Sequence, residues 1–177
     1  MEMAWRHYHA GTREDAVMIS LRVLEAQPKN PDALHLLGVL AYQANQQEEA
    51  IRLITEAIRN HKKYAPMHGN LALAKLAQGN LAGATASARK ALALSPSYAD
   101  AHRVLGLVYQ RKGQLDPAVE EFRRAQRLGL DTPDLQRHLA EALSGLQASK
   151  AARSSPSVGC GIEEKSPMQS SSAVPSK

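Results

Sequence analysis

Small residues recur every 34 positions along this chain. One column contains only alanine and glycine: Ala4, Gly38, Ala72, Gly106 and Ala140. The positions just before them are all apolar: Met3, Leu37, Leu71, Leu105 and Leu139. Two further columns are almost entirely alanine: Ala16, Ala50, Ala84 and Ala118, then Val23, Ala57, Ala91 and Ala125. A fixed period of this length indicates stacked copies of one supersecondary unit.

A turn is expected once in each period. Glycine or asparagine fills a fifth column, formed by Gly11, Asn45, Gly79 and Gly113. These residue types tolerate the left-handed backbone conformation that closes a helix. The segments between the turns are rich in alanine and leucine, which are strong helix formers. Each unit is therefore predicted to be a pair of antiparallel helices.

Gly38 and Gly106 lie inside segments that otherwise read as helices, LHLLGVLAYQ and HRVLGLVYQR. Glycine inside a helix costs about 1 kcal/mol relative to alanine. We expect the second helix of each unit to cross closely at this point, through its own alanine, because a larger side chain would separate the pair. Burial of several leucines, at about 1.5–3 kcal/mol each, offsets the cost. The columns of small residues are thus predicted to serve packing.

The pattern resembles the tetratricopeptide repeat family, whose helix–turn–helix unit carries W-x2-L-G-x2-Y, then A-x3-F, then P. Residues 99–132 match best, through Leu105, Gly106, Tyr109, Ala118 and Phe122. They depart from it at His102, where the family often has tryptophan, and at Leu130, where it often has proline. The resemblance implies an all-α fold, a right-handed α-solenoid of stacked antiparallel helix pairs with about nine helices. It also implies a bacterial-type repeat protein.

The repeat phase divides the chain into an array over residues 1–148 and a tail over residues 149–177. The array comprises a partial repeat at 1–30, repeats at 31–64, 65–98 and 99–132, and a capping helix at 133–147. Asn30 before Pro31 and Thr132 before Pro133 are typical of helix starts. The tail is rich in serine and proline, contains Cys160, and is predicted to be disordered.

Composition excludes several classes of protein. No apolar run approaches the roughly 18 residues that cross a membrane, and the first residues lack the apolar core of a secretory signal. We therefore expect a cytoplasmic protein with no membrane partner. The formal net charge of +5 is spread over a long surface, so nucleic-acid binding is disfavoured.

Sequence motifs for chemistry are missing as well. The chain has no H-E-x-x-H, C-x-x-C, P-loop or G-x-S-x-G pattern. His68 and His102 share one repeat position and are predicted to be half-buried packing residues, and the side chains of His7 and His9 diverge on one helix. We expect no enzyme activity, no catalytic residue, no cofactor and no metal site.

A binding groove is the function that the resemblance implies, because first helices of stacked repeats line a concave face that usually holds the ligand. Reading this face by the period predicts an aromatic and apolar N-terminal half and an arginine-rich C-terminal half. The predicted groove residues are Trp5, Tyr8, His35, Val39, Tyr42, Asn70, Leu73, Arg103, Leu107, Gln110, Arg111 and Arg137. Such a groove would take a protein or peptide segment with apolar and acidic groups, as in an adaptor or scaffold.

Two alternatives and one exclusion accompany this interpretation. Segments of the chain resemble repeat regions that precede bacterial glycosyltransferase or sulfotransferase domains, so the chain could instead present substrates to such an enzyme. Self-association through the N-terminal helix is the second alternative, since Met3 and Trp5 could be exposed there. Binding of a chaperone C-terminal peptide is disfavoured, because only Asn70 matches the donors that the family uses for it.

Overall fold

The computed structural model describes residues 1–154, which form nine α-helices and no strand. The helices are α1 (Glu2–His9), α2 (Arg13–Ala26), α3 (Pro31–Gln43), α4 (Gln47–Asn60), α5 (Ala65–Ala77), α6 (Leu81–Leu94), α7 (Ala99–Arg111), α8 (Leu115–Arg127) and α9 (Pro133–Ser154). None of these helices combines the length and the apolarity that a bilayer crossing requires.

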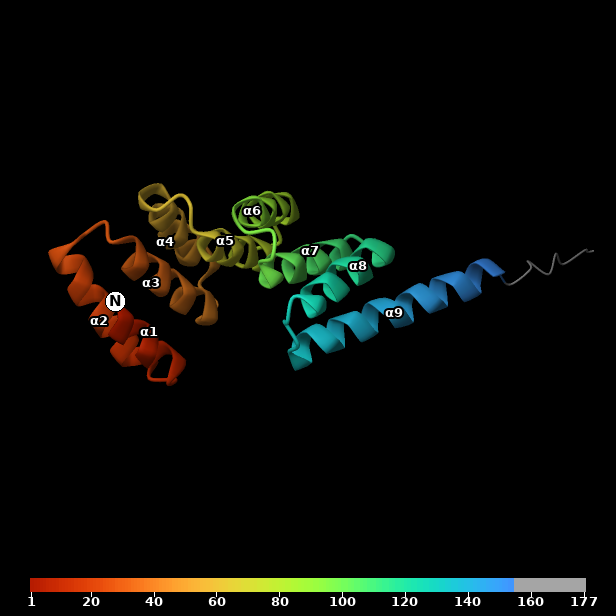
Figure 1. Cartoon of the computed structure of the whole chain (residues 1–177), viewed down its shortest axis with the longest axis horizontal. Helices are drawn as coiled ribbons and strands as arrows, with labels where there is room; N and C mark the ends of the chain where they lie inside the picture. Colours follow the sequence, from red (N-terminus) through yellow and green to blue (C-terminus); the bar gives the residue numbers. More distant parts are fainter. Residues whose placement is uncertain (155–177) are drawn as a thin grey trace, which may run out of the picture.

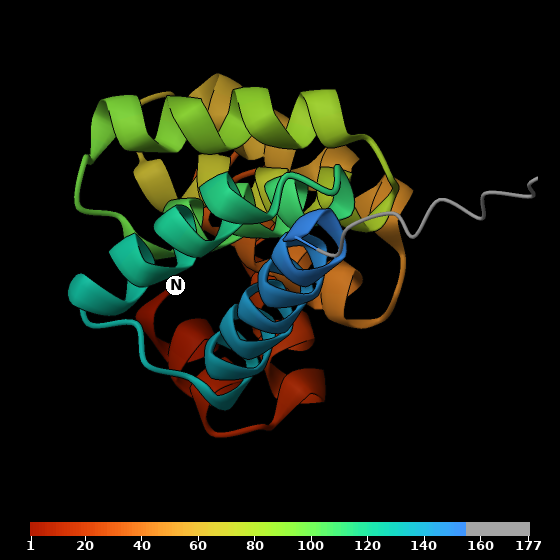
Figure 2. The same ribbon diagram turned by 90° about the vertical axis from the view of Figure 1, so that its right-hand side faces the viewer.

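Successive helix pairs stack into an extended superhelix, with α1 and α2 at one end and α9 at the other (Figure 1). The pairs α1–α2, α3–α4, α5–α6 and α7–α8 are hairpins, and each pair also packs on the next one along the chain. Seen along the length of the array, the pairs rotate relative to one another (Figure 2). The predicted all-α solenoid of about nine helices is confirmed.

The predicted turn column adopts the left-handed conformation at every position. Gly11 has φ +80°, Gly79 +83° and Gly113 +71°, and Asn45 has φ 61°. Each of these residues closes the first helix of a hairpin, where most side chains with a Cβ would be strained. Gly129, with φ +91°, closes α8 in the same way. The sequence column at a 34-residue spacing did not include it.

Gly38 and Gly106 lie inside first helices at points where the second helix of the hairpin comes close. A Cβ built on Gly38 would lie 2.5 Å from Ile54 Cγ1 and 3.3 Å from the Ala50 carbonyl oxygen. At Gly106 it would lie 2.5 Å from Cδ1 of the Phe122 ring. Close crossing is therefore confirmed, but the group that faces each glycine is the large side chain four residues after the alanine. The alanine itself leaves room for the backbone.

The predicted caps are present. The Asn30 side chain accepts a hydrogen bond from the Ala33 amide (3.0 Å), and Thr132 Oγ1 accepts one from the Leu135 amide (3.3 Å). The predicted end of the last helix at residue 147 is wrong, because α9 continues to Ser154. Residues 148–153, ASKAAR, contain mainly strong helix formers. The disordered tail was therefore predicted to begin too early, and its remainder, with Cys160, lies outside the described residues.

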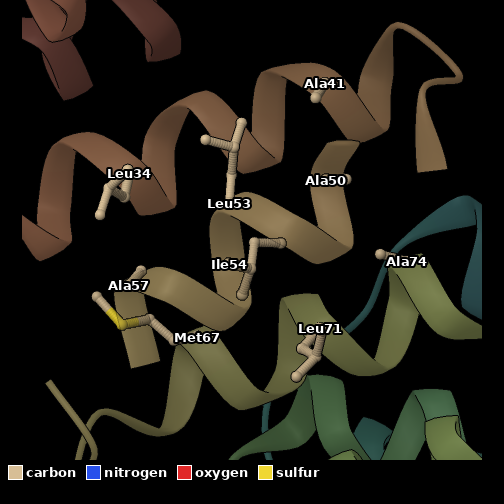
Figure 3. Packing of buried hydrophobic residues seen from close by; sticks show 9 residues of the cluster. All are labelled: Leu34, Ala41, Ala50, Leu53, Ile54, Ala57, Met67, Leu71 and Ala74. Atoms are coloured by element: carbon tan, nitrogen blue, oxygen red, sulfur yellow. The ribbon is translucent and has the colours of Figure 1, made fainter. Parts of the chain in front are cut away.

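The core consists of aliphatic side chains and alanines that form layers between hairpins. One layer joins α3, α4 and α5 through Leu34, Leu53, Ile54, Met67 and Leu71, with Ala50, Ala57 and Ala74 between them (Figure 3). Equivalent layers follow around Val104 and around Phe122. Because each layer lies between consecutive hairpins, the array is continuous and the first helices keep a fixed relation to one another.

Candidate functional site

First helices of successive hairpins contact one another along one side of the array, as α3 with α5, α5 with α7, and α7 with α9. This crowding places them on the inner side of the curve. A hollow of about 440 Å³ lies between them, which we call the concave hollow. Its lining consists of Tyr42, Leu73, Leu76, Ala77, Arg103, Leu107, Gln110, Arg111, Asp134, Arg137, His138 and Glu141.

The concave hollow brings together most of the predicted groove residues. These are Tyr42, Leu73, Arg103, Leu107, Gln110, Arg111 and Arg137. Tyr42, Leu73 and Leu107 are half-buried and provide an apolar floor. The arginines come from α7 and α9 and surround this floor, so apolar and cationic groups face one space.

The three arginines differ in their partners. Arg103 donates from Nε and Nη2 to Asp100 Oδ1 (3.1 and 2.9 Å). Arg137 donates to Glu141 Oε1 and Asp134 Oδ1 at 3.2 Å each. Arg111 instead donates from Nη1 to the Leu76 carbonyl oxygen at the end of α5. Among the described residues no carboxylate pairs with it, so its remaining N–H groups are available to an incoming acceptor.

A polar network on α9 closes one end of the hollow. Glu141 Oε2 accepts a hydrogen bond from Gln110 Nε2 (3.2 Å), which links α9 to α7. Burial alone would raise the pKa of Glu141, but hydrogen bonds from Gln110 and Arg137 bring it below its ordinary value. Hydrogen bonds from Asp134 and Glu141 raise the pKa of Arg137. Glu141 and Arg137 are therefore both charged at neutral pH.

Asp134, His138 and Glu141 line the hollow but were not among the predicted site residues. Asp134 and Glu141 lie three residues before and four residues after Arg137 on one helix. Residues at this spacing share a helix face and form ion pairs. That spacing was the signal that could have added them to the predicted site.

The remaining predicted groove residues lie outside the hollow. They are Trp5, Tyr8, His35, Val39 and Asn70, and they belong to α1, α3 and α5. Val39 is buried, with 9 % of its surface exposed. The Tyr8 hydroxyl accepts a hydrogen bond from Gln43 Nε2 (2.7 Å). These contacts hold the first hairpin against the second.

His35 lies at the centre of this second group. Only 2 % of it is exposed, and its ring lies 5.4 Å from the Trp5 ring and 6.1 Å from the Tyr64 ring, centroid to centroid. The Asn70 side-chain amide donates to His35 Nε2 (2.8 Å). Burial lowers the pKa of His35 to about 4, so the neutral ring accepts this hydrogen bond at neutral pH. His35 is therefore a packing residue between repeats, and the prediction that it faces a ligand is wrong.

Trp5 is half-buried because Tyr8, His9 and His35 surround its ring. Met3 in the same helix is 62 % exposed. The two residues that the sequence suggested for self-association therefore differ, and Met3 is the more exposed of the two.

His68 and His102 also have structural partners. His68 and His102 are 7 % and 4 % exposed, more deeply buried than predicted. His68 Nε2 lies 3.0 Å from the Lys62 carbonyl oxygen, and His102 Nδ1 lies 2.7 Å from Glu121 Oε2. Within residues 1–154 no group of three or more metal-ligating side chains converges on a common point.

Comparison with known proteins identifies the repeat. Profiles of the tetratricopeptide repeat match residues 1–65, 72–113 and 99–128, so together they span most of the described chain. The chain belongs to the tetratricopeptide repeat family. Its helix pairs, left-handed turns and close glycine crossings are those of tetratricopeptide repeats, although His102 replaces the usual tryptophan in the best-matching copy.

Curated relatives and solved structures include proteins that are named for their tetratricopeptide repeats. Tetratricopeptide repeat protein 36 from Bos taurus is 35 % identical over 59 % of this chain and 57 % of that protein. Peroxisome biogenesis protein 5 from Arabidopsis thaliana is 32 % identical over 64 % of this chain. The matched region spans only 16 % of the plant protein and little more than half of the bovine one.

Two solved structures share the fold. TTC0263, a thermophilic tetratricopeptide repeat protein of Thermus thermophilus, superimposes with a TM-score of 0.72 at 24 % identity, covering 89 % of this chain and 91 % of TTC0263. The first such domain of Spaghetti (RPAP3), solved with the HSP90 peptide SRMEEVD, gives a TM-score of 0.63 at 20 % identity, covering 67 % and 96 % of the two chains.

Proposed function

We propose that this chain is a non-catalytic protein-interaction module that holds a peptide segment in the concave hollow. One observation carries the proposal: residues of four different helices, α3, α5, α7 and α9, surround one space with an apolar floor and guanidinium groups at its edge. The first domain of Spaghetti (RPAP3) was solved with a bound peptide, which supports the same use of the fold here.

The chemistry of the hollow favours a segment that combines an apolar side chain with a carboxylate. Tyr42, Leu73 and Leu107 offer apolar contact area for the former. Arg111 offers a bidentate donor for the latter, because no carboxylate of the described residues occupies it. The charges of Arg103 and Arg137 are already balanced by Asp100, Asp134 and Glu141, so these arginines add less attraction.

Binding of a chaperone C-terminal peptide through the usual donors stays disfavoured. His35 and Val39 are buried at two of the positions concerned, Val104 is fully buried at a third, and the Asn70 amide is engaged by His35. The alternative role beside a glycosyltransferase or sulfotransferase gains no support from the hollow or from the relatives described above.

The experiment is a binding screen on an array of random heptapeptides, with SRMEEVD as a reference. We expect selected peptides to be enriched in aliphatic and acidic residues. SRMEEVD should bind more weakly than the best of them, because the usual donors for a chaperone peptide are missing here. The best peptide is then titrated by fluorescence anisotropy against Arg111→Ala and Tyr42→Ala, each with an expected loss of about tenfold in affinity. Arg89→Ala, an exposed arginine on α6, is the matched control and should bind normally. Equal binding by all three variants would refute the proposal.

A further inference from the structure

Large apolar side chains are exposed on the second helix of the array. Met18 is 54 % exposed and Leu21 is 45 % exposed, and both lie in the middle of α2. α2 packs against α1 and α3 and lies at the end of the array (Figure 1). This face of α2 therefore has solvent as its neighbour in the described chain.

The same face carries no large apolar side chain at the equivalent positions of the later repeats. The position of Met18 is taken by Arg52 in α4, Ala86 in α6 and Glu120 in α8. The position of Leu21 is taken by Thr55, Arg89 and Arg123. Because these residues occupy the corresponding position in their own hairpins, the fold does not require an apolar side chain there. The two apolar residues on α2 thus mark a surface with another use.

Charges on this face of α2 are unpaired. Glu14, Met18, Leu21 and Arg22 follow the spacing that places residues on one helix face. Glu14 and Arg22 are exposed and form no ion pair with any residue of the described chain. In α4, by contrast, the arginines of the equivalent face pair within the helix, Arg52 with Glu49 and Arg59 with Glu56.

An apolar groove adjoins the exposed residues. It has a volume of about 460 Å³ and lies between α2, α3 and α4. Its lining includes Val17, Leu21 and Leu24 from α2, and Leu34 and Leu37 from α3. Leu21 belongs both to this groove and to the exposed face. A side chain from another helix laid on α2 therefore has an apolar space to enter, and a flexible methionine suits such a space.

We propose that this face of α2 pairs with the same face of a second copy of the chain, with the two helices antiparallel and centred on Met18. In this register Glu14 lies opposite the partner's Arg22, and Arg22 lies opposite the partner's Glu14. A two-fold axis makes the contact self-complementary, so each ion pair forms twice. Glu25 falls opposite the turn at the partner's Gly11, where it meets no like charge.

Charge also fixes the orientation. In a parallel pair, Glu14 would lie beside the partner's Glu14 and Arg22 beside the partner's Arg22, and like charges at such positions repel. A single helix against a single helix is a small interface, so the dimer is weak, with a dissociation constant on the order of 10–100 µM. The concave hollow is formed by other helices and stays accessible in such a dimer.

Sedimentation velocity of the full chain over a range of concentrations tests the proposal. We expect a concentration-dependent monomer–dimer equilibrium. Glu14→Arg or Arg22→Glu alone should weaken the dimer about tenfold, because each change replaces two attractions by two repulsions. The double variant that carries both changes should restore the wild-type equilibrium, since the new Arg and Glu again face each other across the two-fold axis.

Glu48→Arg is the matched control, because Glu48 occupies the position of Glu14 one repeat later and is also exposed. It should leave the equilibrium unchanged. Circular dichroism melting checks that every variant is folded. A wild-type chain that stays monomeric up to about 1 mM would overturn the proposal. A monomer–dimer equilibrium that neither single change alters would equally overturn it. So would a weakened equilibrium that the double variant does not restore.

Discussion

The ring of Phe122 lies directly against the backbone of Gly106, so that a Cβ at this glycine would come 2.5 Å from Phe122 Cδ1 and Cε1. Both residues are buried, and they join the middle of α7 to the middle of α8. Gly38 and Ile54 repeat the relationship between α3 and α4. In these two hairpins the close approach of the helices thus depends on the absence of one methyl group.

Gly106→Ala should destabilise the protein by about 1–2 kcal/mol. Alanine gains about 1 kcal/mol in helix propensity, but forcing a Cβ against a buried ring costs up to about 3 kcal/mol. Urea unfolding measures the change. Gly38→Ala should cost less, because the Ile54 side chain that it meets is more flexible than a ring.

Phe122→Leu tests whether the Phe122 ring causes the penalty of Gly106→Ala. In that background the penalty of Gly106→Ala should shrink, since the smaller side chain vacates the space that the ring fills. Strictly additive effects in this double-mutant cycle would show that the ring is not what opposes the methyl group.

Gly79→Ala should cost about 1 kcal/mol for a different reason. At Gly79 a Cβ would meet nothing within 4 Å, so the only penalty is the positive φ of +83°. Asn45 already holds the equivalent turn with φ 61°, and Asn45→Gly should change the free energy of unfolding by less than about 0.5 kcal/mol. Thermal unfolding of Gly79→Ala and of Asn45→Gly measures both changes in stability. A similar loss of stability in the two variants would contradict this account.

The turns and the hairpin arrangement were predictable because each depends on the residue type at one position. Gly11, Asn45, Gly79 and Gly113 supply the left-handed conformation through their own chemistry, whatever surrounds them. The small residues at the helix crossings are similarly a local requirement. A period that repeats such requirements determines how the chain stacks, even when most other positions vary.

Burial and pairing on the concave side were less predictable because they depend on neighbours from other helices. His35 and Tyr42 are seven residues apart on α3, yet Trp5 and Tyr64 cover the first and leave the second open to the hollow. The predicted arginines, Arg103, Arg111 and Arg137, line the same hollow. That Arg111 alone contacts a backbone carbonyl follows only from how α5 and α7 are juxtaposed.

The low pKa of the buried His35 should make the free energy of unfolding decrease at acid pH. Its pKa is about 4 in the folded chain and near its ordinary value of 6.5 in the unfolded chain. As the pH falls below 6.5, His35 becomes protonated in the unfolded state but stays neutral in the folded state until about pH 4. The unfolding free energy therefore decreases over this window, by about 3 kcal/mol in total, and is unaffected by this residue above it.

His35→Gln isolates this contribution, because the glutamine side chain can still accept a hydrogen bond from Asn70 but cannot titrate. We expect the stability difference between the variant and the wild type to shift in favour of the variant between pH 7 and pH 4, by up to about 3 kcal/mol. Trp5, the single tryptophan, lies beside His35 and reports unfolding by fluorescence. His61→Gln removes an exposed histidine that stacks on Tyr64 and should show no such shift. If His35→Gln and His61→Gln follow the same pH profile, the imidazole of His35 is not the group that the fold keeps neutral.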